Sequence, residues 1–209
     1  MLNQWGKEVL EQIEDLSIDL WRPYKNLVEE LMPNAQVVAD RFDVMKQVND
    51  ELDQERKKQK RDAQNHKKQA NLDVLAGLTK SKYALLKNEH SLNEQQKLKL
   101  EQVKKVSPLL GMHELKEELR RIFKTSIDWL AGLFNLDNWL AIAAQYFPES
   151  QTTIIRWFDE VIAYFENRTM SGVVEGINNK LKLIKRSTYG FRNFDNFRIR
   201  CLICWHFNC

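Results

Sequence analysis

Two short apolar runs that each carry an aspartate near their end constrain the fold of this chain most. They are Leu16–Leu20, which contains Asp19, and Ala35–Asp40. A short helix is expected between them, over Tyr24–Met32. Strand, helix and strand in this order predict a βαβ unit, with two parallel strands and a right-handed crossover. Ligands gather at the carboxyl ends of parallel strands, so Asp19 and Asp40 are candidate site residues.

A second constraining feature is a basic helix near the other end of the chain, over Ser171–Arg186. Glu175 stands at its head, and every later charge in the run is basic. Mg²⁺ prefers carboxylate oxygens and keeps several waters, so two or three carboxylates suffice to hold it. Asp19 and Glu175 are therefore candidate metal ligands. By spacing alone the alternative stays open that these acids only cap helices or satisfy their dipoles.

The net charge of +3 hides a strong asymmetry along the chain. From Gly176 to the end, seven basic residues face one acid, Asp195, so this segment carries +6 and the rest of the chain −3. A basic segment of this kind is typical of proteins that bind a polyanionic partner, most simply DNA or RNA.

Composition describes an ordinary soluble protein that is long enough to bury a core. The 209 residues are 43% hydrophobic and 29% charged, which fits one domain, or a core with an insertion. We expect neither a signal peptide nor a membrane span, because no run approaches the ~20 apolar residues that a bilayer needs. All cysteines fall in the last nine residues, which favours a reducing cytoplasm.

The middle of the chain has helical periodicity throughout. Val44, Val48 and Leu52 share one helical face, and a basic arm over Glu55–Gln69 follows, which we interpret as a solvated helix. Ser91 is expected to open the next helix through a capping box with Glu94. The histidines of this region, His66, His90 and His113, are expected to face solvent.

Aromatic and aliphatic side chains then recur at helical spacing up to Phe165, and we expect them to form a core. Among them are Trp129, Phe134 and Trp139. Three parts are thus predicted: residues 1–52 with the two strands, residues 53–170 with the basic arm and a helical insertion, and residues 171–209 with the Glu175 helix and a tail.

The tail carries four side chains that could bind zinc: Cys201, Cys204, His206 and Cys209. Their spacing is cramped for a zinc site, and apolar residues interleave with them. Free, buried thiols are the default interpretation, and zinc stays the alternative.

Three blocks in order resemble the DDE transposases of bacterial insertion sequences, in the group named ISL-three. The blocks are Ser17–Tyr24, Pro33–Val44 and Glu175–Phe191, and the end Asn193–Arg200 is similar to that of the family as well. The resemblance covers essentially the whole chain.

The resemblance implies an α/β fold that is mostly helical. It would be a partial RNase H-like core, consisting of the βαβ unit plus the C-terminal helix, interrupted by a large all-helical insertion. Such transposases cut DNA at the ends of the element and join the freed 3′ hydroxyl to a target, with Mg²⁺ or Mn²⁺. Asp19 and Glu175 would be the metal ligands, in the bacterial cytoplasm. The residues that would contact DNA are Lys180, Lys182, Lys185, Arg186 and Arg192.

This chain departs from the family pattern in ways that affect the activity we expect of it. The family's first metal-binding Asp has no counterpart here, so we expect a truncated transposase without a competent active site of its own. Asp43 stands where relatives usually carry His. A non-catalytic DNA-binding or regulatory fragment that acts on a full-length transposase or a second copy is the alternative. A plain helical interaction protein is a third hypothesis.

Overall fold

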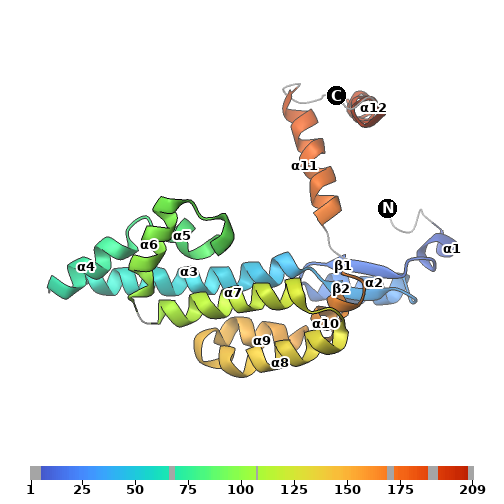
Figure 1. Ribbon diagram of the computed structural model, residues 1–209. Coiled ribbons are helices and arrows are strands. Elements are labelled where there is room, and N and C mark those ends of the chain that lie inside the picture. The colour runs from blue at the N-terminus through green and yellow to red at the C-terminus, as the bar shows by residue number, and fades with distance from the viewer. Residues whose placement is uncertain (1–5, 66–68, 107, 169–171, 188–192, 207–209) are drawn as a thin grey trace. The chain divides into compact units, whose positions relative to one another are not determined.

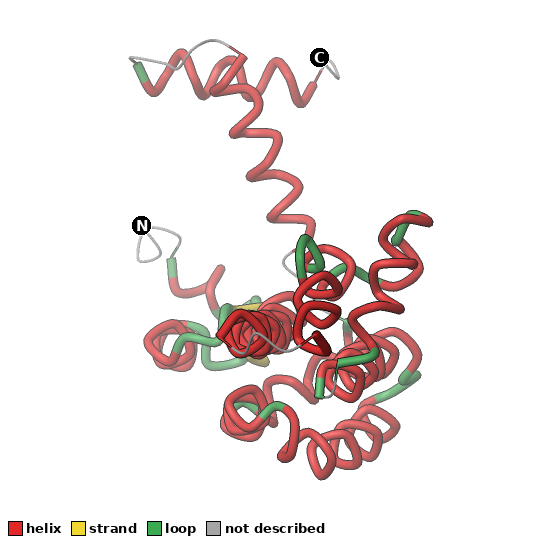
Figure 2. Tube along the Cα trace, turned by 90° about the vertical axis from the view of Figure 1, so that its left-hand side faces the viewer, coloured by secondary structure: helices red, strands yellow, loops and turns green. Residues whose placement is uncertain are grey.

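The computed structural model describes residues 6–65, 69–106, 108–168, 172–187 and 193–206. It divides into two compact units, Met1–Thr169 and Met170–Cys209, each of which is described by itself. The described chain is mostly helical, with a small pair of strands in the first unit (Figures 1 and 2). This confirms the predicted mostly helical α/β composition.

The two predicted strands are present and parallel. Strand β1 (Asp15–Ile18) pairs with β2 (Gln36–Ala39), and helix α2 (Arg22–Leu31) connects them. A short helix, α1 (Lys7–Leu10), precedes β1. In the register of the sheet Ile18 lies opposite Ala39, so each strand ends one residue before an aspartate.

Helix α3 (Arg41–Asn65) begins directly after β2. Asp40 starts it, because its carboxylate oxygen Oδ1 accepts a hydrogen bond from the Phe42 N–H at 2.9 Å, which satisfies a free donor of the first turn. Val44, Val48 and Leu52 are fully buried, as their spacing predicts. The basic second half of α3 is mostly exposed, as expected of a solvated arm.

Helices fill the chain between α3 and the end of the first unit, which confirms the predicted helical middle (Figure 1). These elements are α4 (Gln69–Leu78), α5 (Lys82–Leu86), the 3₁₀ turn η2 (Glu89–Ser91), α6 (Glu94–Lys104), α7 (Leu109–Thr125), α8 (Trp129–Tyr146), α9 (Pro148–Arg156) and α10 (Phe158–Asn167).

The capping box that opens α6 lies two residues later than predicted. The Asn93 side chain accepts from the Gln96 N–H at 2.9 Å, and Gln96 Oε1 accepts from the Asn93 N–H at 3.2 Å. Ser91 instead ends η2, where its hydroxyl donates to the Asn88 carbonyl at 2.8 Å. Asn is as good an N-cap as Ser, and the helix begins after Asn93.

Helices α3, α7, α8, α9 and α10 pack around one core. Trp139 and Phe165 are buried there, as predicted, and Phe165 stacks on Phe123 with ring centroids 5.5 Å apart. The prediction fails for Trp129 and Phe134, whose exposed fractions are 47% and 59%. Both side chains lie at the surface of α8.

Helix α10 returns the chain to the sheet by packing on β2. Gln36 at the start of β2 donates to Glu166 at 2.9 Å, and Arg41, just after β2, donates to the Tyr164 hydroxyl at 3.2 Å. Lys25 of α2 forms an ion pair with the buried Glu160. The helical middle therefore leaves β2 through α3 and comes back onto β2 through α10.

The second unit consists of α11 (Gly172–Ser187) and α12 (Phe194–His206), which contact each other. None of the described helices combines the length and the apolar character that crossing a bilayer requires.

Candidate metal and nucleic-acid site

Three carboxyl groups gather at the carboxyl ends of the two parallel strands. Asp19 follows β1 and is exposed, and Asp40 follows β2 and is buried. Asp43 lies in the first turn of α3, and its carboxyl group hydrogen-bonds that of Asp19. The strand ends therefore bring together the two aspartates that the βαβ prediction places there, and Asp43 joins them.

The pKa of Asp43 is raised to about 6, mainly by burial and then by the negative charges of Asp19 and Asp40. Close carboxylates cannot all ionise freely, so one of them retains its proton to a higher pH. Asp43 was not predicted as a site residue. The signal that could have identified it is its place three residues after Asp40, one helical turn beyond the strand end.

The oxygen ligands at the strand ends suit a hard divalent cation. Mg²⁺ is usually held by one or two carboxylates with waters completing its octahedron. Within the described ranges, no group of three or more His, Cys, Asp or Glu side chains is arranged to hold a metal ion. The aspartates fit such an ion by the chemistry of their oxygens, but they need a further ligand to complete a metal centre.

Glu175 is the predicted further ligand, and it belongs to the other unit. It lies in the first turn of α11, at the head of the helix, as the sequence predicts. Asp19 lies in the first unit and Glu175 in the second. Their convergence on one metal ion therefore stays a prediction.

Helix α11 carries most of the predicted DNA-contacting residues. Lys182, Lys185 and Arg186 are exposed, whereas Lys180 is half-buried. The first three recur at spacings of three and four residues, so they share one helical face. Arg192 lies outside the described residues. Exposed basic side chains on one helical face can contact successive phosphates of a nucleic-acid backbone.

The cysteines of α12 are free thiols in the described part of the tail. Cys204 is buried and Cys201 is half-buried. Cys209 lies outside the described residues, as does the side chain of His206. The zinc hypothesis therefore stays untested.

One of the three mid-chain histidines differs from its prediction. His90 is exposed, as expected, and His66 lies outside the described residues. His113 is buried, with an exposed fraction of 1%. It lies on the same face of α7 as Leu109 and Lys116. This face packs against neighbouring helices. The pKa of His113 is lowered to about 4, mainly by burial and then by the positive charge of Lys116.

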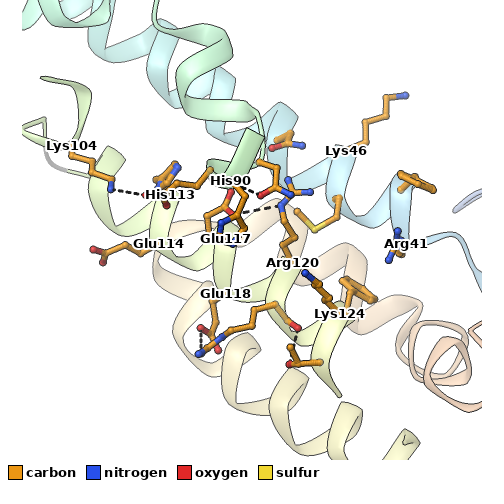
Figure 3. A pocket seen from close by; sticks show the side chains of 18 of the residues that line it. Arg41, Lys46, His90, Lys104, His113, Glu114, Glu117, Glu118, Arg120 and Lys124 are labelled. Atoms are coloured by element: carbon orange, nitrogen blue, oxygen red, sulfur yellow. Dashed lines mark hydrogen bonds and ion pairs between the residues drawn. The ribbon is translucent and has the colours of Figure 1, made fainter. Parts of the chain in front are cut away.

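His113 lines a cavity of about 1200 Å³ in the first unit, shown in Figure 3. Its walls come from the first half of α3, from α7, and from η2 and α6. Arg41 and Lys46, close to the strand-end aspartates in sequence, lie at the α3 wall. No feature of the sequence alone predicts this cavity, because its walls are far apart along the chain.

Comparison with known proteins gives one matching family model, described as Transposase (DDE_Tnp_ISL3), over residues 1–201. The transposase for insertion sequence element IS1001 of Bordetella parapertussis is 26% identical over 197 residues, which cover 91% of this chain. The transposase for insertion sequence element IS1557 of Mycobacterium tuberculosis is 29% identical over a match 209 positions long, gaps included, and this match covers 90% of this chain.

In both transposases the match covers 47% of the relative, so the chain spans about half the length of these curated relatives. An ATP-dependent protease of Lactococcus lactis is 38% identical over 60 residues, a match of only 27% of this chain. No solved structure gives a significant match. Because the family model covers nearly all of the sequence, the chain belongs to the DDE_Tnp_ISL3 transposase family of insertion sequences.

Proposed function

We propose that this chain carries part of the catalytic centre of an insertion-sequence transposase that cuts and joins DNA with a divalent metal ion. The observation that carries the proposal is the place of Asp19 at the carboxyl end of a parallel strand, beside Asp40 and Asp43. Family membership supplies DNA as the substrate class.

The proposal assigns the metal to Asp19 and Glu175, with the β1–α2–β2 unit and α11 as parts of an RNase H-like core. A bound Mg²⁺ or Mn²⁺ would supply activation of the attacking oxygen and stabilisation of the leaving oxygen. Asp40 has a different role, because its carboxylate caps α3 through the Phe42 N–H and thereby fixes where Asp43 stands. Asp19 is exposed at the strand end, where its oxygens are accessible to an ion from solvent.

The exposed face of α11 is proposed to hold the DNA backbone. Lys182, Lys185 and Arg186 would contact phosphates without reading the base sequence, which positions a strand but does not specify it. Lys180 and Arg192 are further proposed contacts.

The metal assignment is tested by calorimetric titration of the full chain with Mn²⁺. We expect saturable binding by the wild type that Asp19→Asn and Glu175→Gln each abolish. Glu29→Gln, an exposed acid of α2, is the matched control and should bind as the wild type does. Binding that survives Glu175→Gln would contradict the shared site, and a folded wild type that binds no Mn²⁺ would contradict the metal centre in this chain.

The exposed basic face of α11 favours a second candidate, a DNA-binding or regulatory fragment without catalysis that acts on a full-length transposase or a second copy. This candidate predicts DNA binding that falls steeply with added salt, because phosphate contacts release counterions. Lys182→Gln with Lys185→Gln should weaken binding under both candidates. Saturable Mn²⁺ binding that Glu175→Gln abolishes would decide for the catalytic one.

A further inference from the structure

The cavity of about 1200 Å³ in the first unit has a basic lining. Seven lysines and arginines line it against four glutamates. Three of these glutamates are already engaged: Glu89 pairs with Lys104, Glu118 with Arg121, and Glu117 with the buried Lys116 at 2.7 Å. The negative charge of the lining is therefore mostly neutralised by the protein itself.

Three of the basic side chains have no such neutralising partner. Among the described residues, no carboxylate lies within ion-pair distance of Arg41, Lys46 or Lys124. Lys46 and Lys124 are exposed, so both can move toward a ligand. Lysines and arginines without counter-ions around a cavity favour an anionic ligand.

A buried polar atom of the lining also lacks a partner. His113 Nε2 has no hydrogen-bond partner within the described structure, although the side chain is only 1% exposed. Leaving such a group buried and unsatisfied is unfavourable. Figure 3 shows His113, Glu117, Arg120 and Lys124 along the cavity side of α7. Arg120 Nε, on the same side, is likewise buried without a hydrogen-bond partner.

The wall that includes η2 is held in place independently of any ligand. The buried ammonium group of Lys116 donates to the carbonyl of Leu85 at 2.8 Å and to that of Lys87 at 3.0 Å. These bonds fix the end of α5 and the segment that leads into η2 against α7. The cavity is thus formed before a ligand arrives, which lowers the ordering cost of binding.

A metal ion fits this lining less well than an anion. The described residues contain no arrangement of three or more His, Cys, Asp or Glu side chains suited to a metal. The carboxylate of Glu117, about one helical turn from His113 on α7, is bound by Lys116 and faces Arg120 at 3.7 Å. The cations without a carboxylate partner, Arg41, Lys46 and Lys124, favour phosphate oxygens.

The cavity also lies next to the strand ends. Arg41 directly follows Asp40, and Lys46 lies just over one helical turn further along α3. We propose that this cavity binds phosphate groups of the DNA strand that flanks the strand-end aspartates, through Arg41, Lys46, Arg120 and Lys124. The inference rests on the proposed function and adds to it a second DNA-binding surface, within the first unit.

The test compares the binding of a fluorescent DNA duplex to variants of the full chain at several salt concentrations. Lys46→Gln with Lys124→Gln removes two exposed cavity cations. Lys82→Gln with Lys105→Gln removes two exposed cations that do not line the cavity, and it is the matched control. We expect the cavity variant to bind about tenfold more weakly, with a log–log salt slope less steep by about 2, since each lost phosphate contact changes the slope by about 0.9.

The outcomes separate this inference from the proposed function. Unchanged affinity and slope in the cavity variant, together with a loss in Lys182→Gln with Lys185→Gln, would overturn the cavity assignment alone. An equal loss in the control pair would also overturn it, because net charge would then explain the effect. A wild type that binds no DNA would overturn both.

A second measurement does not depend on any variant. Acetylation of Lys46 and Lys124 by an amine-reactive reagent should be slowed by DNA, while acetylation of Lys82 should not change. Inorganic phosphate at the same phosphate concentration is the comparison. Protection by inorganic phosphate without protection by DNA would overturn the assignment to a DNA strand.

Discussion

Asp19 and Asp43 share a hydrogen bond between their carboxyl groups, although they lie on different elements. The pKa of Asp43, about 6, lies well above the ordinary 3.8. Between these two pH values the folded chain binds more protons than the unfolded chain. The stabilising contribution of Asp43 is therefore complete below about pH 3.8 and is lost as the pH rises through about 6.

We predict that Asp43→Asn stabilises the metal-free protein above pH 7. Removal of one negative charge relieves its repulsion with Asp19 and Asp40, and solvent screening limits the gain to about 1 kcal/mol. Urea unfolding in a chelator at pH 7.5 and at pH 4 measures it, and the gain should shrink at the lower pH. Asp50→Asn, an exposed acid of the same helix, is the control. Equal stability of wild type and Asp43→Asn at pH 7.5 would refute the prediction.

Gly132 allows α8 to pack closely on α10. A Cβ atom at this position would lie 2.4 Å from Cδ2 of Phe165, a fully buried ring. We predict that Gly132→Ala lowers the free energy of unfolding by about 1–3 kcal/mol, because the core is already filled. Thermal or urea unfolding checks this.

Gly77→Ala is the matched control, since its Cβ would meet the Gln102 carbonyl oxygen at an ordinary 3.5 Å. Alanine is the better helix former by about 1 kcal/mol, so this variant should be as stable as the wild type or more stable. A Gly132→Ala protein that behaves like Gly77→Ala would show that α8 and α10 are not packed as described.

Glu51 of α3 connects the helix to the start of α9. Its carboxylate accepts from the Ser150 N–H at 2.8 Å, from the Ser150 hydroxyl at 2.6 Å and from the Glu149 N–H at 3.1 Å. We predict that Glu51→Ala costs about 2–3 kcal/mol of stability, because it leaves buried donors unsatisfied. Glu51→Gln, which keeps an acceptor, should cost less.

The control for Glu51 is Glu55, one turn further along α3. Its carboxylate binds Gln59 and Lys58 at the surface, so Glu55→Ala should change stability by no more than about 0.5 kcal/mol. Similar losses in the two alanine variants, measured by urea unfolding, would contradict a special role of Glu51.

We predict that the protein loses stability in mild acid because His113 is buried. Its pKa is about 4 in the folded chain and 6.5 ordinarily, so the unfolded chain binds the extra proton between these values. Stability is complete above about pH 6.5 and falls as the pH drops toward 4, by up to about 3 kcal/mol. The groups that act on it are Lys116, Glu117, Lys104 and Arg120.

Urea unfolding at intervals from pH 7 to pH 4 measures this dependence. His113→Gln cannot take up the proton and should flatten the curve over this range, whereas His90→Gln, at an exposed histidine, should leave it unchanged. A curve that stays steep in His113→Gln would assign the pH dependence to other groups.

The βαβ unit could be predicted because all its signals are local. Two apolar runs and a short helix determine the order of the elements, and the parallel pairing follows from that order. The same holds for the burial of Val44, Val48 and Leu52. Asp19 and Asp40 could be placed at the strand ends for the same reason.

Periodicity shows which residues share a helical face, but not whether another element covers that face. Trp129 and Phe134 were therefore expected in the core and are exposed, whereas His113 was expected in solvent and is buried. The cavity depends on how helices far apart in sequence pack together. The contact between Asp19 and Asp43 depends on how the first turn of α3 lies beside the end of β1. The pairing of Asp19 with Glu175 follows from their types and places in the sequence and from the family resemblance, whereas their spacing alone does not establish it.

The helical middle begins and ends on the same strand, since α3 starts where β2 stops and α10 packs back onto β2. Its two ends are thus anchored side by side, like the stem of a very long loop. Closing a longer loop adds little entropic cost, because that cost rises only with the logarithm of its length. Evolution can therefore lengthen or shorten the outlying helices α4 to α6 while the aspartates at the strand ends keep their positions.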